Sequence, residues 1–246
     1  MRIWDIDPGF LNHQSLLGEH RELHGILSII GNQKKGYARH PETLRWKPYI
    51  GSLCLRHELL IAEMMLRGFR HHSPVNIPEN TPEWPEKFLD TPAEQFAHLK
   101  TKYSNKQPGR IPLPQNIQQL WANHKYSVMA RSPQAYQEIG PHVANQQITF
   151  DDLALRLVKL LRLKPLRQRI VNALEHMWGY VSEYAPHCNP QGELWQAMRD
   201  IQHLAFKHHV EYLIHSTALG ELAYWRQEEE RAGRDEMFDS PSFSWG

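Results

Sequence analysis

The chain has 246 residues, of which 41% are hydrophobic and 22% charged, and its formal net charge at pH 7 is +1. This composition is typical of an ordinary soluble globular protein, and the total charge is too small to indicate a nucleic-acid partner. No apolar stretch approaches the roughly 20 residues of a membrane span, and the first residues do not read as a signal peptide. The only two cysteines, Cys54 and Cys188, lie far apart, which excludes a disulfide framework. We therefore expect a cytoplasmic protein with no membrane segment.

Charge is unevenly distributed along the sequence. Between Arg21 and Arg70 there are nine basic and four acidic residues, a local excess of +5, whereas the stretch 228–239 is acidic. A basic segment of this kind fits contact with phosphate groups, and an ordinary solvated surface fits it equally well.

Hydrophobic periodicity and capping residues predict helices throughout the chain, and strand-like alternation is nearly absent. The sequence therefore predicts an all-α fold. Two main helices are expected first, at about 13–30 and 50–68. Prolines then recur from Pro74 to Pro114 and predict an irregular connection, interrupted by one helix that starts after the cap Thr91 and ends near Tyr103. Five more helices are expected, near 115–130, 133–144, 150–163, 166–184 and 191–231.

The proline-rich connection also suggests where the chain divides. We place the boundary at Gln107-Pro108-Gly109. This gives two helical domains, 1–107 and a helical bundle at 108–232, followed by a tail at 233–246.

The first helix has two different faces at 100° per residue. One face is an apolar core stripe formed by Leu16, Leu23, Ile26, Leu27 and Ile30. The opposite face carries Gln14, Gly18, Arg21 and Gly25, and Glu22 lies on the flank between the two. Each glycine inside a helix costs about 1 kcal/mol relative to alanine, so its position needs a reason. Either a foreign backbone such as a phosphate chain approaches this face, or the face packs against another part of the protein.

Several segments in a fixed order carry a resemblance to a known family. They are Met1-Arg-Ile-Trp4 with Pro8-Gly-Phe-Leu11, the run Gln14-Ser-Leu-Leu-Gly-Glu-His-Arg-Glu-Leu23, Gly36-Tyr-Ala-Arg-His-Pro41, and the run from Arg56 to Phe69. Residues 1–75, and with less similarity those to about 105, resemble the pyrimidine-dimer DNA glycosylases of the phage endonuclease V type, in their bacterial branch. The resemblance implies an endonuclease V-like helical domain that binds double-stranded DNA and needs no cofactor.

Members of that family cleave the glycosidic bond of an ultraviolet-damaged pyrimidine and then nick the abasic strand. The resemblance implies that the terminal amine of Met1 is the nucleophile and that Glu22 assists it. A terminal amine suits this chemistry because the pKa of an α-amino group is ordinarily near 7.7, against roughly 10.4 for lysine. Its unprotonated form can attack C1′ of the deoxyribose and form an imine, which permits β-elimination. A nearby carboxylate can stabilise the sugar cation and move protons.

The same resemblance assigns contacts with DNA. Arg2 and Arg21 match phosphate-binding positions, Gln14 matches a polar residue at the damage site, and His40 matches a family histidine, although a structural role for this histidine is the alternative. Lys35 and Arg39, from the basic segment, complete the expected DNA-binding set.

Two positions depart from the family pattern. The phage enzymes expose a threonine amine after methionine removal, whereas here Arg2 follows Met1. Aminopeptidase does not normally remove methionine before arginine, so Met1 is expected to stay and to supply a bulkier amine at the lyase step. Gly25 stands where the phage enzymes have another arginine, which removes one phosphate contact.

Residues 116–226 resemble a second bacterial domain, one of uncharacterised biochemistry. The similarity rests on the runs Trp121–Tyr136 and Arg169–Tyr180, and on Gly140 with Val143-Ala144. It implies a helical fold and little about function. A phosphate or nucleotide pocket would use a helix end and a polar stripe, and a buried polar network is the alternative. The candidate residues are His124, Lys125, Tyr126, Arg131, Asn172 and His176.

The sequence thus predicts a DNA repair glycosylase, with or without abasic-site lyase activity. The alternative is a non-catalytic DNA-binding or nucleotide-binding protein that keeps the scaffold. Zinc-like spacings occur in His20 with His24 and in His203 with His208 or His209, but without an accompanying acid or cysteine we predict no metal site. The sequence does not indicate an oligomeric state.

Overall fold

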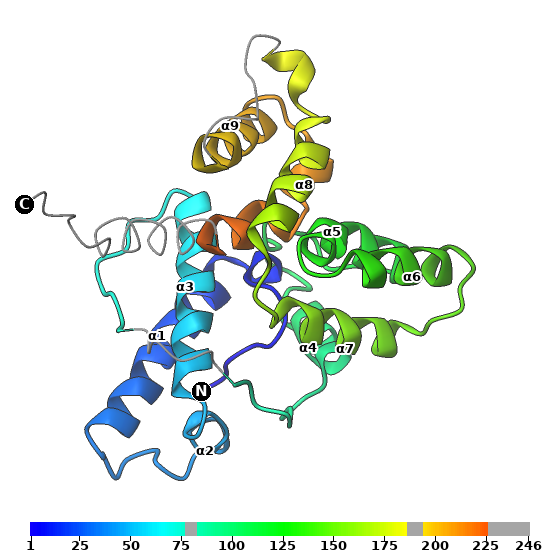
Figure 1. Ribbon diagram of the computed structural model, residues 1–246. Helices are drawn as coiled ribbons and strands as arrows, with labels where there is room; N and C mark the ends of the chain where they lie inside the picture. The colour runs from blue at the N-terminus through cyan, green and yellow to red at the C-terminus, as the bar shows by residue number, and fades with distance from the viewer. Residues whose placement is uncertain (77–82, 186–193, 226–246) are drawn as a thin grey trace, which may run out of the picture.

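The structure is a computed structural model that describes residues 1–76, 83–185 and 194–225 (Figure 1). These residues form helices and no strand, so the predicted all-α class is confirmed. Residues 218–225 are also helical. In chain order the labelled elements are η1 (Pro8–Phe10), α1 (His13–Gly31), α2 (Pro41–Trp46), α3 (Ile50–Leu66), α4 (Pro92–Lys102), α5 (Ile117–Met129), α6 (Pro133–Ala144), α7 (Phe150–Leu161), α8 (Arg167–Trp178), η2 (Ser182–Tyr184), α9 (Leu194–Lys207) and α10 (Glu211–Ile214).

Short polar caps explain why the early helix predictions agree with the structure to within a few residues. The Asn12 side chain accepts the backbone N–H of Ser15 at the start of α1, over 2.9 Å. Thr91 and Glu94 form a reciprocal capping box at α4, with Pro92 in the first turn. Thr149 caps α7 through the backbone N–H of Asp152. Each cap satisfies a backbone group that the first helical turn leaves without a partner.

Three helix predictions were wrong or incomplete. The short helix α2 was missed, although His40 as cap and Pro41 in the first turn are its signals. The helix predicted at 166–184 ends at Trp178, and a separate 3-10 turn follows.

The single helix predicted at 191–231 is divided in the structure into α9, α10 and the helical residues 218–225. The two ends of the predicted range lie outside the described residues. His209 adopts a left-handed φ of 53°, which interrupts the helix after α9. Further on, Thr217 donates through its backbone N–H and its hydroxyl to the carbonyl of Asn123 on α5.

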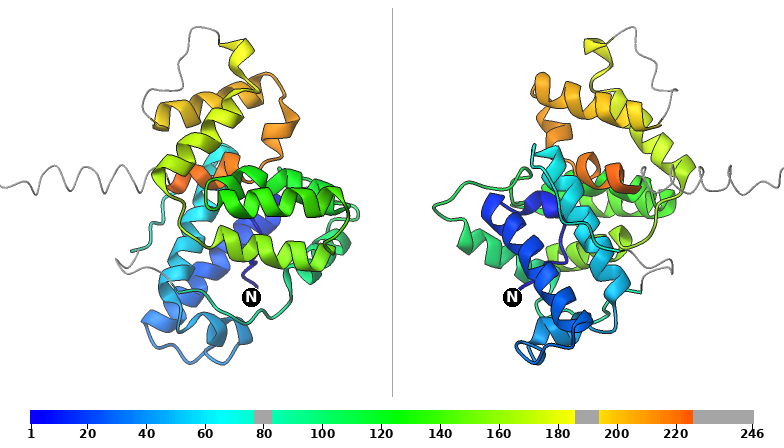
Figure 2. Two further views of the ribbon diagram at one scale, coloured as in Figure 1. Left: turned by 45° about the vertical axis from the view of Figure 1, so that its right-hand side comes forward. Right: turned by 90° about the vertical axis from the view of Figure 1, so that its left-hand side faces the viewer.

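The helices pack in neighbouring groups (Figures 1 and 2). Helix α1 lies along α3 and contacts α2, while α4 packs on α7. Helix α5 contacts α6, α7 and α8, and α8 in turn contacts α9. None of the described helices is long and apolar enough to cross a bilayer.

Packing is continuous across the proposed boundary at residue 107. One hydrophobic cluster joins Ile3, Phe10 and Phe96 to Leu120 and Leu153. A second cluster joins Leu55 on α3 to residues of α5, α8, α9 and 218–225. At the boundary itself, Ile111 donates its N–H to the carbonyl of Gly9 over 2.9 Å. The division into 1–107 and 108–232 therefore stays a prediction about the sequence, because the two parts share their cores.

Candidate active site at the N-terminal amine

Side chains on three helices accept hydrogen bonds from the backbone of the first residues of the chain. The backbone N–H groups of residues 2–5 each donate to a different side chain: Arg2 to Glu22, Ile3 to Glu42 over 3.1 Å, Trp4 to Glu19 over 3.1 Å, and Asp5 to Gln95 over 2.8 Å. The acceptors lie on α1, α2 and α4. We call residues 1–5 and these four acceptors the amine corner. A segment bound in this way has its backbone donors satisfied and its position fixed.

Packing and ion pairs hold the segment further. Ile3 and Trp4 are buried, and the Asp5 carboxylate binds Arg45 at 2.5 Å and Arg162 of α7's C-terminal end at 2.6 Å. The N-terminal residues of most proteins are poorly ordered. Here the contacts of residues 3–5 hold the chain within a few residues of the amine. The anchored segment therefore fixes where the amine lies.

The amine and Glu22 converge, as the resemblance implies they should. The Met1 nitrogen lies 3.8 Å from Oε1 of Glu22, while Oε2 of the same carboxylate accepts the Arg2 N–H. The Glu22 side chain is 38% exposed, and that of Met1 is 13% exposed. The Glu22 carboxylate is thus partly exposed to solvent, and one of its oxygens is held by the Arg2 N–H while the other faces the amine.

Glu19 has a different role, although it lies only one helical turn before Glu22. Its carboxylate is fully buried and binds both Nε and Nη2 of Arg56, at 2.8 and 2.9 Å. Burial raises the pKa of Glu19 against the opposing effect of Arg56. Glu42 is also buried, which raises its pKa, and it accepts the indole N–H of Trp46 over 3.2 Å. Both acids position the chain and do not face solvent.

Sequence reasoning missed these positioning residues. Glu19 could have been found, because at 100° per residue it falls within the apolar stripe of α1, where an acid needs a buried partner. Gln95 on α4 gives no comparable sequence signal for its bond to Asp5.

The exposed face of α1 is open. Gln14 and Arg21 are exposed, and a Cβ atom built on Gly18 or Gly25 would meet nothing within 4 Å. The alternative that these glycines pack against another part of the protein is therefore wrong for the described residues. Gln14 lies two turns before Glu22, about 12 Å along the helix axis.

The other expected DNA contacts are dispersed around this face. Lys35 and Arg39 are exposed in the turn between α1 and α2. His40 caps α2 by accepting the Glu42 N–H at Nδ1, which is the structural alternative for this histidine. Arg2 binds Asp90 at 2.6 Å and stacks over the Trp4 ring. Of the expected residues, the structure brings Met1, Arg2 and Glu22 into one site, with Arg21 on the adjacent helix face.

The six candidates of the second part do not meet at one surface. His124 is buried against Phe10, and burial lowers its pKa to about 4. Arg131 binds both carboxylate oxygens of Glu221, each at 2.8 Å. These contacts favour the buried polar network over a phosphate site.

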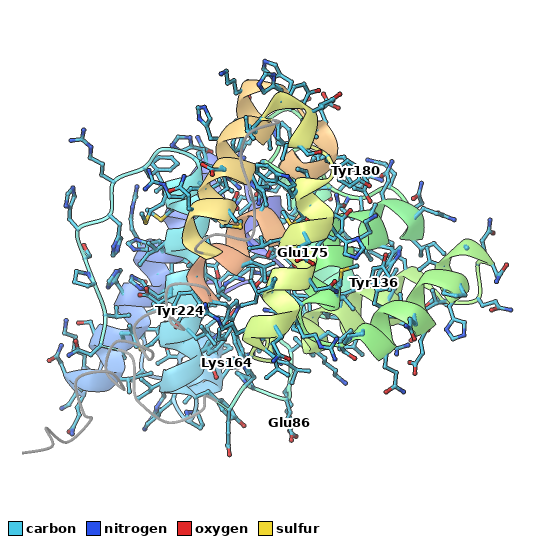
Figure 3. All side chains as sticks on the ribbon, turned by 45° about the horizontal axis from the view of Figure 1, so that its top comes forward. Glu86, Tyr136, Lys164, Glu175, Tyr180 and Tyr224 are labelled. Atoms are coloured by element: carbon cyan, nitrogen blue, oxygen red, sulfur yellow. The ribbon has the colours of Figure 1, made fainter. Side chains whose placement is uncertain are left out.

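The remaining candidates lie on α5 and α8. Lys125 sits over the rings of Tyr126 and Tyr212, and burial raises the pKa of the Tyr126 hydroxyl. Tyr212 stacks with Tyr180, which lies just after α8 and is labelled in Figure 3. Asn172 is half-buried and His176 is exposed. As binding residues they stay predictions.

Histidines that could hold a metal come together elsewhere. His20 and His24 of α1 meet His57 of α3 and His71, which follows α3. The sequence paired only the first two. Within the described residues, His203, His208 and His209 are not part of such a group.

Two segments of the sequence match known protein families. Residues 1–77 match the sequence model of a family described as pyrimidine dimer DNA glycosylase, and residues 125–191 match that of a family described as protein of unknown function (DUF1722). No curated protein and no solved structure matches the chain. The segment that contains the amine, Glu22 and the open face of α1 therefore lies in the part of the chain that matches the pyrimidine dimer DNA glycosylase family, and a part that matches a family of unknown function follows it.

Proposed function

We propose that the protein is a DNA repair glycosylase for damaged pyrimidines in double-stranded DNA, with the Met1 amine as nucleophile and Glu22 as the acid–base residue. The observation that carries this proposal is the 3.8 Å separation between the Met1 nitrogen and the partly exposed Glu22 carboxylate, inside the segment that matches the family. The proposal requires that Met1 is the first residue of the working protein and that its amine is unmodified.

The geometry supports a defined sequence of steps. The unprotonated amine attacks C1′ of the damaged nucleotide, the glycosidic bond breaks, and the base leaves with the bonding electrons and takes up a proton. Loss of the amine protons and opening of the sugar ring give an imine. In the proposal Glu22 accepts and returns these protons through Oε1, which faces the amine, while its Oε2 accepts the Arg2 N–H.

The lyase step follows from the same imine. Removal of a C2′ proton sends electrons toward the imine and expels the 3′ phosphate, which cuts the strand. In the proposal Glu22 assists this proton removal too, so a single carboxylate serves both steps.

The open face of α1 is the proposed DNA surface. Its two glycines leave room for a phosphate backbone, and Arg21, Lys35 and Arg39 supply exposed positive charge beside it. A glycosylase must also take its target base out of the stack, which costs less where damage has weakened pairing. The lesion-bearing strand would then reach Met1 and Glu22 at the flank of this face.

The test replaces Glu22 by Gln and measures glycosidic-bond cleavage and strand nicking on duplex DNA that contains pyrimidine dimers, and nicking on abasic duplex DNA. We expect a loss of at least about 100-fold in rate with DNA affinity kept, since positioned acid–base groups contribute roughly that much. The matched control is Glu138→Gln on α6, an exposed glutamate that binds Arg156 at 2.6 Å far along the chain.

Equal rates for Glu22→Gln and the wild type would contradict the role of Glu22. If the wild type binds DNA with a steep salt dependence but neither releases bases nor nicks any lesion, the protein is the non-catalytic DNA-binding module that we considered as the alternative.

A further inference from the structure

Four histidines from three segments meet on the side of α1 that faces α3. His20 and His24 are one turn apart on α1, His57 is on α3, and His71 follows α3. One nitrogen from each lies within 4.8 Å of the others. Ring centroids of neighbouring pairs are 4.7–5.2 Å apart.

Two nitrogens of this cluster lack the hydrogen-bond partners that buried imidazoles normally have. Nε2 of His20 and Nε2 of His71 are buried and form no hydrogen bond. Nε2 of His57 faces Nε2 of His24 at 3.1 Å, a contact that needs a proton on one of them and a lone pair on the other. Buried polar atoms are nearly always satisfied, so two orphaned nitrogens aimed into one cluster indicate a missing partner.

We propose that His20, His24, His57 and His71 bind one divalent transition-metal ion of the zinc type, which fastens α1 to α3 and to the segment after α3. Imidazole nitrogen is a preferred ligand for zinc, copper and nickel. Four ligands satisfy the tetrahedral geometry of a structural zinc site, in which nitrogens at about 2.0 Å from the ion lie about 3.4 Å from one another. The nitrogen–nitrogen distances of the cluster are at most 4.8 Å, so the widest shortens by at most about 1.4 Å to reach that arrangement.

Outer contacts fit the same role. Nδ1 of His57 lies 3.0 Å from Oε1 of Glu58, the carboxylate–histidine pairing that directs Nε2 toward a metal.

The site is separate from the amine corner. His20 and His24 each lie two residues from Glu22, about 160° away around the helix axis. The ion is consequently a structural element of the α1–α3 pair in this proposal, with no part in the reaction at Met1.

The test uses the full-length chain. After removal of metals with a chelator, the protein is given one equivalent of Zn²⁺, passed through a desalting column and assayed for bound metal. We expect one ion per chain and a melting temperature that rises by roughly 5–10 °C at zinc concentrations about 100-fold above Kd. Co²⁺ in place of zinc should give the intense visible absorption of a tetrahedral site.

His71→Gln is the first variant, because His71 lies outside the helices and its loss leaves α1 and α3 intact. It should lose the retained ion and the thermal shift, while His176→Gln, at an exposed histidine of α8, should keep both. Retention of stoichiometric zinc by His71→Gln and by His20→Gln, or a wild type that retains none, would overturn the proposal. If a variant fails to fold, a Co²⁺ spectrum of the wild type without tetrahedral absorption would overturn it equally.

Discussion

Glutamates in two regions of the molecule are held in opposite ways. Around α3 and residues 218–225, Glu63 binds Arg67 and Arg110, and Glu221 binds Arg131, with both acids at most 4% exposed. We call these residues the acid–arginine network. In the amine corner, Glu22 instead faces the terminal amine and one backbone N–H, and it is 38% exposed.

This difference distinguishes glutamates with a structural role from Glu22, which has the proposed catalytic role. In the acid–arginine network, burial alone would raise the pKa of Glu63, but Arg110 and Arg67 hold it below its ordinary value. Both oxygens of each acid are occupied, and Arg110 also binds the carbonyl oxygens of Ile214 and Ser216. Such acids join segments and have no free oxygen for a substrate. The Glu22 side chain is instead partly exposed beside the Met1 amine, the nucleophile of the proposed reaction.

The largest expected effect comes from removing a buried acid from each region. Glu19→Ala and Glu221→Ala should each lower the free energy of unfolding by about 3–5 kcal/mol, because each leaves a buried arginine without its partner. Urea unfolding measures this loss. Only Glu19→Ala should also lower activity per folded molecule, since Trp4 loses the acceptor of its N–H. An equal loss of activity in Glu221→Ala would break the comparison.

A smaller effect concerns pH and Asp7, a buried acid beside the acid–arginine network. Burial first, and then the charge of Glu63, raise the pKa of Asp7 from 3.8 to about 7. A folded-state pKa above the unfolded value means that the stability contributed below pH 3.8 is lost as the pH rises toward 7. Asp7→Asn stays neutral, so its stability relative to the wild type should increase between pH 4 and 7 and then level off. Thermal melts across this range check the sign, and a flat difference would contradict it.

The smallest effect tests the open face of α1. Gly18→Ala and Gly25→Ala should each raise stability by about 1 kcal/mol, because nothing in the protein lies within 4 Å of the new methyl group. If a phosphate backbone approaches this face, both variants should also bind duplex DNA several-fold more weakly. Gly140→Ala inside α6, where the nearest atom is 4.0 Å away, is the control that should leave DNA affinity unchanged. Unchanged DNA affinity in all three variants would show that this face of α1 does not contact DNA.

Much of the fold could be predicted from the sequence because its determinants are local. The cap Thr91 and the apolar stripe of α1 act within a few residues, and local signals of this kind located most helices. The break near His209 and Thr217 could not be predicted, because the turn binds a carbonyl of α5 more than 90 residues earlier in the chain.

The candidate site, too, depends on contacts between residues that are distant in sequence. Met1 and Glu22 could be named from a resemblance, but the partners that position them are distant in sequence. Gln95 lies 90 residues from Asp5, and Glu42 lies 39 residues from Ile3. Contacts of this range depend on how the helices pack, and a single sequence contains no direct record of that packing.

The most direct measurement is borohydride trapping of the protein on abasic duplex DNA, followed by mass spectrometry of the N-terminal peptide. We expect a covalent complex in which the deoxyribose is joined to the amine of Met1, and no such complex from a chain whose amine is acetylated. A trapped sugar on a lysine, or no trapped complex from a protein with a free Met1 amine, would contradict the role of this amine as the nucleophile.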